Sequence, residues 1–306
     1  MATVTYNQPL NPYTLGSWYN SSSAHFSYAN ASAFQLTDGY HSLTYTGAFT
    51  YDANGVSGGT LDGMYWATGG NPTFSIAGIN ADFNQLLDYS LKGDEQAIAK
   101  ITLQGNDTFI GSNGNDDFYG YAGIDSYNGN GGLDTVWYDT GKTTAIVNPT
   151  DTGYKVITPG KIDTLVNIER LEFGDGSSLA LDVKAGQNAG SAYRLYEAAF
   201  DRKPDTAGLK YWVKEMDNGQ NIGQIAQSFV NSAEFKALNP GQDPNSMINS
   251  YYLHVLHRAA DDAGLQYWNN QMANGMKANE VLVSFSESQE NLNNTQAELA
   301  HGVWLS

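Results

Sequence analysis

The chain of 306 residues contains no cysteine, which excludes a disulfide framework and any thiolate metal site. Basic residues are scarce, since 15 Lys and Arg stand against 32 Asp and Glu, for a net charge of -17. Nucleic acid is therefore a poor partner, because no basic stripe is present to neutralise phosphates. So large an acidic excess is typical of proteins in which a hard divalent cation relieves the repulsion between carboxylates.

Long apolar runs are also missing, and no stretch approaches the roughly 18 residues needed to cross a bilayer. Segment 1–10 has neither the basic start nor the apolar run of an ordinary signal peptide. Neither the His-Glu-x-x-His helix of zinc proteases nor a phosphate-binding glycine loop occurs. We therefore expect no transmembrane segment, no ordinary N-terminal signal and no catalytic centre, so that the protein is not an enzyme.

The first part of the chain has the pattern of β structure. From Ser21 to Ile79 apolar or aromatic residues alternate with small polar ones, and turn signals stand at Asp38-Gly39 and Asn54-Gly55. Segment 81–102 changes to helical spacing, which Gly93 divides. A β-rich N-terminal module that ends in a short helix is therefore predicted for residues 1–102.

A repeat of nine residues runs from Gly105 to Trp137. Each repeat has a glycine, an aspartate two residues later and a large apolar residue two further on, and a second glycine set keeps the same step. In that order these residues are Gly105, Gly114, Gly123 and Gly132; Asp107, Asp116, Asp125 and Asp134; Phe109, Phe118, Tyr127 and Val136; and Gly111, Gly120 and Gly129. The period matches the calcium β-helix signature Gly-Gly-x-Gly-x-Asp-x-U-x, where U is large and apolar, although the first two glycine positions are only partly kept.

Two such repeats complete one coil of a parallel β-roll, because each contributes one turn and one short strand. Aspartates that are two repeats apart then lie on the same edge, so Asp107 pairs with Asp125 and Asp116 with Asp134. Carboxylates and turn carbonyls together supply the oxygens that Ca²⁺ prefers, and about two ions are expected. The candidate metal set comprises Gly105, Asp107, Gly111, Asn113, Gly114, Asp116, Gly120, Ala122, Gly123, Asp125, Gly129, Gly131, Gly132 and Asp134, and the side chains of Asn106 and Asn115 could add ligands.

Strand-like segments resume between 145 and 173, where they cap or extend the roll, so residues 103–185 are predicted as a calcium β-roll with flanking strands. From Ala189 the pattern is helical and is duplicated, since the pattern that runs from Arg202 to Phe229 recurs with the same internal spacing from Arg258 to Phe285. Residues 186–306 are predicted as an all-α duplicated domain that ends in a secretion signal. The whole chain is thus expected to be a multidomain α+β protein.

Some polar and aromatic residues of the helical region could bind a ligand or stabilise the fold. His254 and His257, three apart on an expected helix, could face one metal, but they lack a third ligand and packing roles are favoured. Tyr211-Trp212 and Tyr267-Trp268 are expected to be core anchors rather than sugar platforms.

The helical copies also share an arginine and an aspartate. Arg202 with Asp205, and Arg258 with Asp261, form either a ligand-binding pair in each copy or a loop-stabilising ion pair with a helix cap. We favour the structural role.

Segment Gly111-Ser112-Asn113-Gly114-Asn115-Asp116 above all resembles the repeats-in-toxin (RTX) family of type I secreted proteins of Gram-negative bacteria. The stretch from Asp163 to Gly176 is similar to the one that often follows such repeats. The resemblance implies export by the ATP-driven type I secretion apparatus, which reads an uncleaved C-terminal signal, here ending in Gly302 to Ser306. It also implies that low cytosolic calcium keeps the roll unfolded for passage and that external calcium folds it.

Segments from Arg202 to Trp212 and from Ser232 to Phe235 resemble a domain-of-unknown-function family that is common in S-layer and other type I secreted proteins. By analogy with S-layer proteins, this resemblance implies lipopolysaccharide or further copies of the chain as partners.

The function expected from these patterns is that of a secreted calcium-binding structural or interaction protein of the bacterial surface or extracellular matrix. Calcium would fold it, and S-layer-like self-assembly would follow. A carbohydrate-binding adhesin module that acts as a monomer is one alternative. A glycan-active enzyme with an unfamiliar carboxylate site in the β module is the other.

Overall fold

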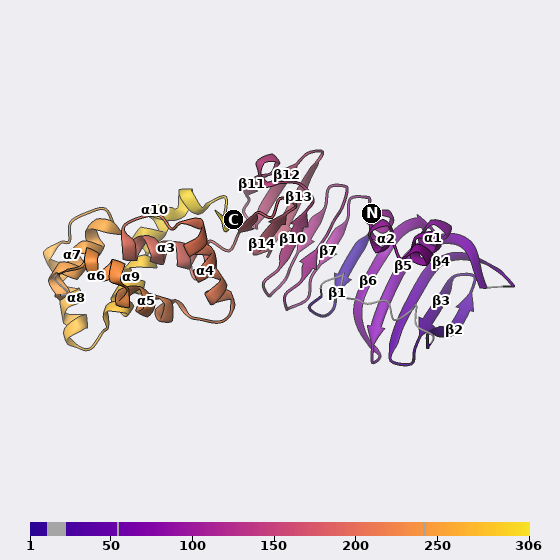
Figure 1. Cartoon of the computed structure of the whole chain (residues 1–306), viewed down its shortest axis with the longest axis horizontal. Helices are drawn as coiled ribbons and strands as arrows, with labels where there is room; N and C mark the ends of the chain where they lie inside the picture. The colour runs from indigo at the N-terminus through magenta and orange to yellow at the C-terminus, as the bar shows by residue number, and fades with distance from the viewer. Residues whose placement is uncertain (11–22, 54, 241–242) are drawn as a thin grey trace. The chain divides into compact units, whose positions relative to one another are not determined.

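A computed structural model describes residues 1–10, 23–53, 55–240 and 243–306. The chain divides into two compact units, Met1–Gly176 and Ser177–Ser306. The first carries a large sheet and two helices, and the second is built mainly of helices (Figure 1). The expected mixed α+β fold, with an N-terminal sheet and C-terminal helices, is confirmed. The start of the predicted β segment at Ser21 and the turn residue Asn54 lie outside the described residues.

Five consecutive antiparallel strands form the N-terminal part of the sheet. They are β2 (His25–Asn30), β3 (Ala33–Thr37), β4 (His41–Asp52), β5 (Gly55–Thr68) and β6 (Asn71–Asp82). Alternation along these strands buries residues such as Phe34 and Leu43 on one face. The predicted turn at Asp38-Gly39 joins β3 to β4. The Asp38 carboxylate stabilises this turn, because it accepts the N–H groups of Tyr40 and His41 at 2.9 and 2.7 Å.

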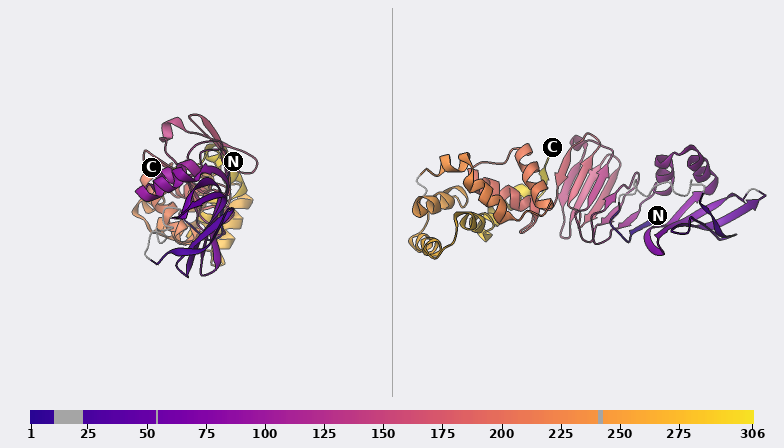
Figure 2. Two further views of the ribbon diagram at one scale, coloured as in Figure 1. Left: turned by 90° about the vertical axis from the view of Figure 1, so that its right-hand side faces the viewer. Right: turned by 60° about the horizontal axis from the view of Figure 1, so that its bottom comes forward.

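Two short helices cover one face of this sheet (Figure 2). Helix α1 spans Phe83–Lys92 and α2 spans Glu95–Thr102, and Gly93 separates them with a φ of 67°, as the sequence predicted. The ring of Phe83 packs edge-on against Phe34 and Phe49, with centroid distances of 5.5 and 5.2 Å. The helices thereby cover part of the apolar side of the sheet.

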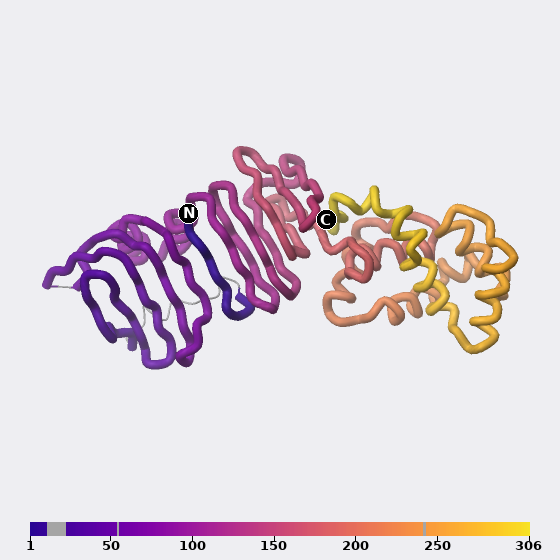
Figure 3. Tube along the Cα trace, turned by 180° about the vertical axis from the view of Figure 1, so that it is seen from behind, coloured from indigo at the N-terminus to yellow at the C-terminus, as the bar shows by residue number. Residues whose placement is uncertain are grey.

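The nonapeptide repeats form short strands that alternate between two sheets. Strand β7 (Thr108–Ile110) pairs in parallel with β9 (Ser126–Asn128), and β8 (Asp117–Phe118) pairs in parallel with β10 (Thr135–Tyr138). Paired residues are two repeats apart, so one coil takes two repeats, and the successive runs lie side by side in the Cα trace (Figure 3). The apolar repeat residues point inward as predicted, and each is at most 1% exposed: Phe109, Phe118, Tyr127 and Val136.

After the repeats the chain leaves these sheets and returns to them. A 3₁₀ turn, η3 (Lys142–Thr144), precedes β11 (Ile146–Pro149) and β12 (Tyr154–Thr158), which run antiparallel to each other. Strand β13 (Lys161–Val166) is antiparallel to β12 and parallel to β9, and β14 (Arg170–Phe173) is parallel to β10. These strands extend both sheets beyond the repeat strands.

The first strand joins the N-terminal hairpins to the repeat strands. Strand β1 (Thr3–Tyr6) pairs antiparallel with β6 and parallel with β7, which gives one sheet of eleven strands in the order β11-β12-β13-β9-β7-β1-β6-β5-β4-β3-β2. The boundary expected between residues 102 and 103 therefore lies inside one continuous sheet. Strand β1 was not predicted, because a strand of four residues is too short for a clear periodic signal.

The second unit contains two copies of a helical arrangement. Its helices are α3 (Asn188–Phe200), α4 (Thr206–Asp217), α5 (Ile222–Asn231) and α6 (Ala233–Leu238), followed by α7 (Pro244–His254), α8 (Asp262–Ala273), α9 (Ala278–Ser286) and α10 (Gln289–Leu299). All four helices of the second set begin at the same offset in sequence from their equivalents in the first, which confirms the duplication. Within this unit β15 (Ser178–Ala180) pairs antiparallel with β16 (Val303–Trp304) and so links its two ends.

Candidate functional site

The four repeat aspartates occupy equivalent buried positions. Each stands immediately before the short strand of its repeat, and each is at most 3% exposed: Asp107, Asp116, Asp125 and Asp134. A buried carboxylate is costly unless hydrogen bonds or a cation compensate for the lost water. The partners of each carboxylate oxygen therefore decide what the site can bind.

One oxygen of each carboxylate connects neighbouring coils. The backbone N–H of Asp107 donates to Asp125 Oδ1 at 2.9 Å, and the N–H of Asp116 donates to Asp134 Oδ1 at 2.8 Å. The structure thus brings together the aspartates that are two repeats apart, in two ladders. The bond that each carboxylate accepts from the backbone of the preceding coil was not predicted from the sequence.

Both ladders begin in the first ten residues. The N–H of Ala2 donates to Asp107 Oδ1 at 2.5 Å, and the N–H of Leu10 donates to Asp116 Oδ1 at 2.9 Å. Segment 1–10 therefore takes the place of a preceding coil, although it lacks the nine-residue motif.

Two acidic residues outside the repeats end the ladders, and the sequence analysis missed both roles. Asp163 Oδ1 accepts the N–H of Asp125 at 2.8 Å, and Glu169 Oε2 accepts the N–H of Asp134 at 2.9 Å. A short signal was present, since Asp163-Thr164-Leu165 has the acid-x-apolar order of the repeats. The inserted strands β11 and β12 move it out of the nine-residue period, which hides it from a search for regular spacing.

The second carboxylate oxygen is satisfied in two of the repeats. Asp116 Oδ2 accepts bonds from the N–H and the hydroxyl of Ser112 at 2.7 and 2.9 Å. Asp125 Oδ2 accepts the hydroxyl of Tyr127 at 3.3 Å, which is a weak bond.

The other two repeats leave this oxygen without a donor. Asp107 Oδ2 and Asp134 Oδ2 are buried and have no hydrogen-bond partner within the described residues. At the end of the first ladder, Asp163 Oδ2 lies 3.4 Å from Lys161 Nζ, so a cation compensates the charge there. A bound metal ion would play the same part for the two repeat aspartates.

Burial raises the pKa of all four repeat carboxyl groups. The loss of water raises the pKa of Asp125 to about 7. Desolvation likewise raises the pKa of Asp134 to about 8, and the carboxylate of Glu169 adds to the rise. The pKa values of Asp107 and Asp116 are raised chiefly by the same desolvation. Without a cation, these sites therefore disfavour the ionised carboxylate.

Glycine is required where the turns approach the carboxylates. A Cβ atom at Gly129 would lie 2.2 Å from Asp134 Oδ2 and 2.1 Å from the carbonyl oxygen of Asn167. At Gly111 and Gly120 it would lie 3.0 and 2.3 Å from the carboxylate oxygen of the next aspartate in the chain, Asp116 and Asp125 respectively. This glycine set thus keeps side chains out of the space on which carboxylate and carbonyl oxygens converge.

The first glycine set allows neighbouring coils to stack closely. Gly123 and Gly132 have φ values of 114° and 126°, which favour glycine. A Cβ atom there would lie 1.9 and 2.6 Å from the carbonyl oxygens of Gly105 and Gly114, their equivalents in the preceding coil.

The remaining candidate residues lie around these turns. Asn113 and Ala122 are both exposed, and a Cβ atom at Gly131 would lie 3.8 Å from the Asn113 carbonyl oxygen. The side-chain oxygens of Asn106 and Asn115 accept the N–H groups of Ile124 and Leu133 in the following coil, both at 2.9 Å. These two asparagines therefore hold adjacent coils together.

The donor chemistry of this region is that of oxygen. The described part of the chain holds no group of three or more His, Cys, Asp or Glu side chains placed to bind a metal. An ion here would need backbone carbonyls beside one or two carboxylates. Such an all-oxygen set suits a hard cation such as Ca²⁺, and the buried oxygens of Asp107 and Asp134 that lack a donor in the described structure fit it.

The arginines repeated in the helical copies have structural partners. Arg202 binds Glu234 and Arg258 binds Glu290, with Nε to Oε1 distances of 2.9 and 2.8 Å. The aspartates that follow them cap α4 and α8, since Asp205 accepts the N–H of Gly208 and Asp261 that of Gly264, both at 2.8 Å. These contacts agree with the structural role that we favoured.

The two histidines do not share a helix. Helix α7 ends at His254, whose Nε2 lies 3.7 Å from Asp201 Oδ2. His257 follows the helix and has a φ of 54°, so the chain has already turned at that point. The expectation that both lie on one helix is wrong.

One serine has the spacing of a hydrolase nucleophile. Gly55-Val56-Ser57-Gly58-Gly59 fits Gly-x-Ser-x-Gly, but it lies within β5 and not at a strand-to-helix turn. The Ser57 hydroxyl donates to Thr50 Oγ1 on β4 at 3.4 Å. The segment is therefore part of a hairpin and not a nucleophile elbow.

Comparison with known proteins finds a similarity in the helical unit. Residues 184–239 and 226–295 match the family described as a domain of unknown function, DUF4214. Both helical copies thus belong to matched segments. No curated protein and no solved structure matches the chain. The DUF4214 matches do not include the nonapeptide repeats, so the calcium interpretation rests on their residues and geometry. Among the described helices, none is long and apolar enough to cross a membrane.

Proposed function

We propose that the nonapeptide segment is a calcium-binding parallel β-roll in a secreted structural or interaction protein of the bacterial surface or extracellular matrix. On this proposal external calcium folds the roll, and the folded protein assembles with further copies. The observation that carries the proposal is the pair of buried oxygens without a donor in the described structure, Asp107 Oδ2 and Asp134 Oδ2.

The repeat aspartates and the turn carbonyls would hold the ions, with Asp107 and Asp125 on one edge and Asp116 and Asp134 on the other. When bound, calcium supplies positive charge to a chain in which acidic residues outnumber basic ones, for a net charge of -17. Metal binding would be coupled to folding, because the unfolded chain offers no assembled site. No catalytic role is part of this proposal.

Export and the surface partner are supported by family resemblance. The repeats resemble those of type I secreted RTX proteins, and the helical unit resembles a domain-of-unknown-function family that is common in S-layer and other type I secreted proteins. These resemblances support the type I route and, by analogy, lipopolysaccharide or further copies as partners.

The edge of the large sheet supports self-assembly. Among the strands of the described residues, β2 is the last in the order, and all six of its residues are exposed, including Phe26 at 50% and Tyr28 at 43%. An exposed edge strand with aromatic side chains is suited to pair with another copy.

Calcium titration by calorimetry tests the proposal, with circular dichroism recorded before and after. The intact protein should bind calcium saturably and gain β signal, and the double variant Asp116→Ala, Asp125→Ala should bind more weakly. Absence of calcium binding by the intact protein would overturn the proposal.

A groove on the coil favours carbohydrate binding as a second candidate function. The exposed ring of Trp137 stacks on Tyr119, with centroids 5.6 Å apart and 10° between the planes. The groove beside these rings has a volume of about 270 Å³ and is also lined by Asp139 and Lys161. Aromatic faces beside charged groups suit a sugar ring. This candidate would be favoured over assembly if the protein binds a glycan and stays monomeric in calcium, and if Trp137→Ala abolishes the glycan binding.

A further inference from the structure

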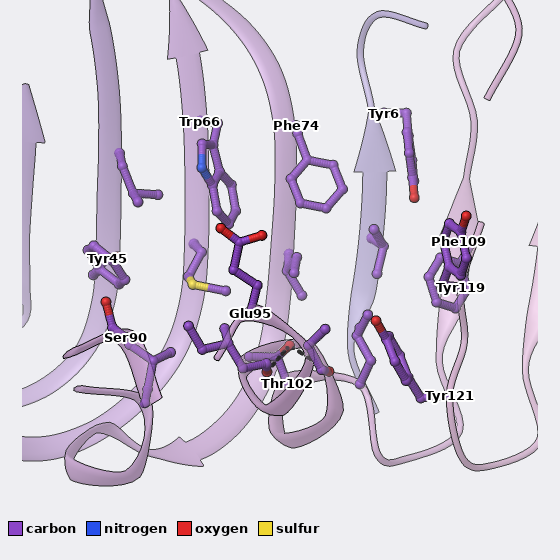
Figure 4. Close-up of a pocket in the computed structure, with 18 residues that line it drawn as sticks. Tyr6, Tyr45, Trp66, Phe74, Ser90, Glu95, Thr102, Phe109, Tyr119 and Tyr121 are labelled. Atoms are coloured by element: carbon purple, nitrogen blue, oxygen red, sulfur yellow. Dashed lines mark hydrogen bonds between the residues drawn. The ribbon is translucent and has the colours of Figure 1, made fainter. Parts of the chain in front are cut away.

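A cavity lies between the helices α1 and α2 and the strands of the first unit (Figure 4). Its volume is about 140 Å³. A cavity of roughly 150 Å³ in another protein holds one benzene molecule. The space therefore suits one compact group rather than a long acyl chain.

Aromatic rings form much of the cavity wall, among them Tyr6, Tyr45, Trp66 and Phe74. The ring centroid of Phe74 lies 5.0 Å from that of Trp66 and 5.2 Å from that of Tyr6. Because the faces of aromatic rings carry negative potential, such a wall attracts a cation.

Among the described residues that line the cavity, Glu95 is the one with a charged side chain. It is the first residue of α2, and its side chain extends toward Trp66 and Phe74 (Figure 4). Tyr6 and Thr102 already donate their hydroxyl groups to backbone carbonyls, both at 3.0 Å. The Glu95 carboxylate therefore sets the charge preference of the cavity.

We propose that this cavity binds a small quaternary or tertiary alkylammonium ion, with the cation among the rings and beside Glu95. An anionic head group would be repelled by that carboxylate, and a neutral group of the same shape would gain neither the ionic nor the cation–π attraction. The proposal does not depend on the calcium function, and it is tested in a constant calcium concentration.

Choline and its neutral isostere 3,3-dimethylbutan-1-ol are the probes, titrated by calorimetry into the full chain. Choline should bind at least about tenfold more tightly than the alcohol, because only choline carries the charge. The indole N–H resonance of Trp66, assigned with Trp66→Phe, should shift on binding. Equal binding of the two probes, or no binding of choline by folded protein, would overturn the proposal.

Three variants locate the site. Glu95→Gln should weaken choline binding at least about tenfold without weakening that of the alcohol, and Ala99→Leu, which fills the cavity, should abolish both. Asp88→Asn is the matched control, because it removes a carboxylate from α1 that pairs with Lys92 at 2.6 Å and does not line the cavity. Equal weakening by Glu95→Gln and Asp88→Asn would mean a general field effect and would contradict the site. Circular dichroism and thermal unfolding, unchanged in each variant, report correct folding.

Discussion

Asp134 accepts the backbone N–H of Asp116 at 2.8 Å through Oδ1, while its Oδ2 is buried without a partner among the described residues. One carboxylate thus has a structural oxygen and a second oxygen that is free for a ligand. The first holds adjacent coils together, and ionisation of the carboxyl group leaves the second costly unless a positive charge lies nearby. A substitution can separate these two properties.

Asp134→Asn is expected to weaken calcium binding about tenfold or more, because it removes a charged ligand. In calcium-free protein above about pH 8 the same change should leave stability unchanged or raised, since the amide keeps an acceptor for the Asp116 N–H and removes a buried carboxylate that is ionised there without compensation. Calorimetry and urea unfolding measure the two effects. Asp151→Asn, in the exposed turn between β11 and β12, is the control and should change neither. Calcium affinity unaltered by Asp134→Asn would place the ion elsewhere.

The calcium-free protein is expected to lose stability as the pH rises. The pKa values of Asp125 and Asp134, about 7 and about 8, exceed the value of 3.8 for an unburied aspartate. Between these limits the folded state binds more protons than the unfolded state, so its stabilising protons are lost as the pH climbs toward 8. Urea unfolding in chelator should therefore show lower stability at about pH 8.5 than at about pH 5.5. Saturating calcium should remove this decline in stability. A rise in stability with pH in chelator would contradict the prediction, because it would show that other groups already compensate the buried carboxylates.

Gly129→Ala and Gly131→Ala test the glycine-lined space. The first places a Cβ atom 2.1 Å from the Asn167 carbonyl oxygen and 2.2 Å from Asp134 Oδ2, so it should destabilise the protein by about 1–3 kcal/mol. The second meets no atom closer than 3.8 Å and should change stability by less than about 0.5 kcal/mol. Thermal unfolding in calcium compares them. Equal effects would mean that the loss comes from backbone freedom rather than from contact with the carboxylate.

The repeat region could be predicted because its spacing is regular, whereas strand pairing between residues that are distant in sequence could not be predicted. The step of nine residues predicted the inward ring of Phe109 and the relation of Asp107 to Asp125 two repeats later, because both follow from one local geometry repeated along the chain. Asp163 lies beyond an insertion of two strands, so its place in the ladder depends on where the chain returns. The role of β1 likewise depends on partners in β6 and β7, which are distant in sequence, and so short a strand carries no period that would reveal it.

Arg194 is a buried charge of the helical unit that the sequence pattern did not distinguish from a surface arginine. It is 1% exposed, and its guanidinium makes two bonds to Glu287, both at 2.9 Å. Arg194→Ala should destabilise the protein by about 3–5 kcal/mol, because it leaves a poorly solvated carboxylate without its partner. Arg258→Ala, which breaks a half-exposed pair with Glu290, should cost less than about 1 kcal/mol. Chemical unfolding followed by helical circular dichroism compares the two, and similar losses would contradict the distinction drawn from burial.

Assembly through the sheet edge is expected to depend on both calcium and β2. In light scattering during a calcium titration, the intact protein should form large particles, because calcium orders the coil whose strands share a sheet with β2. Phe26→Lys with Tyr28→Lys should suppress this growth, since charges on an edge strand oppose pairing with another copy. Tyr40→Lys is the control, because Tyr40 is more exposed, at 63%, but lies in a turn and not on the edge strand. If particles still grow in the Phe26→Lys, Tyr28→Lys variant as well as in Tyr40→Lys, the interface lies away from β2. A constant monomer mass for the intact protein, with calcium bound, would favour the carbohydrate-binding candidate.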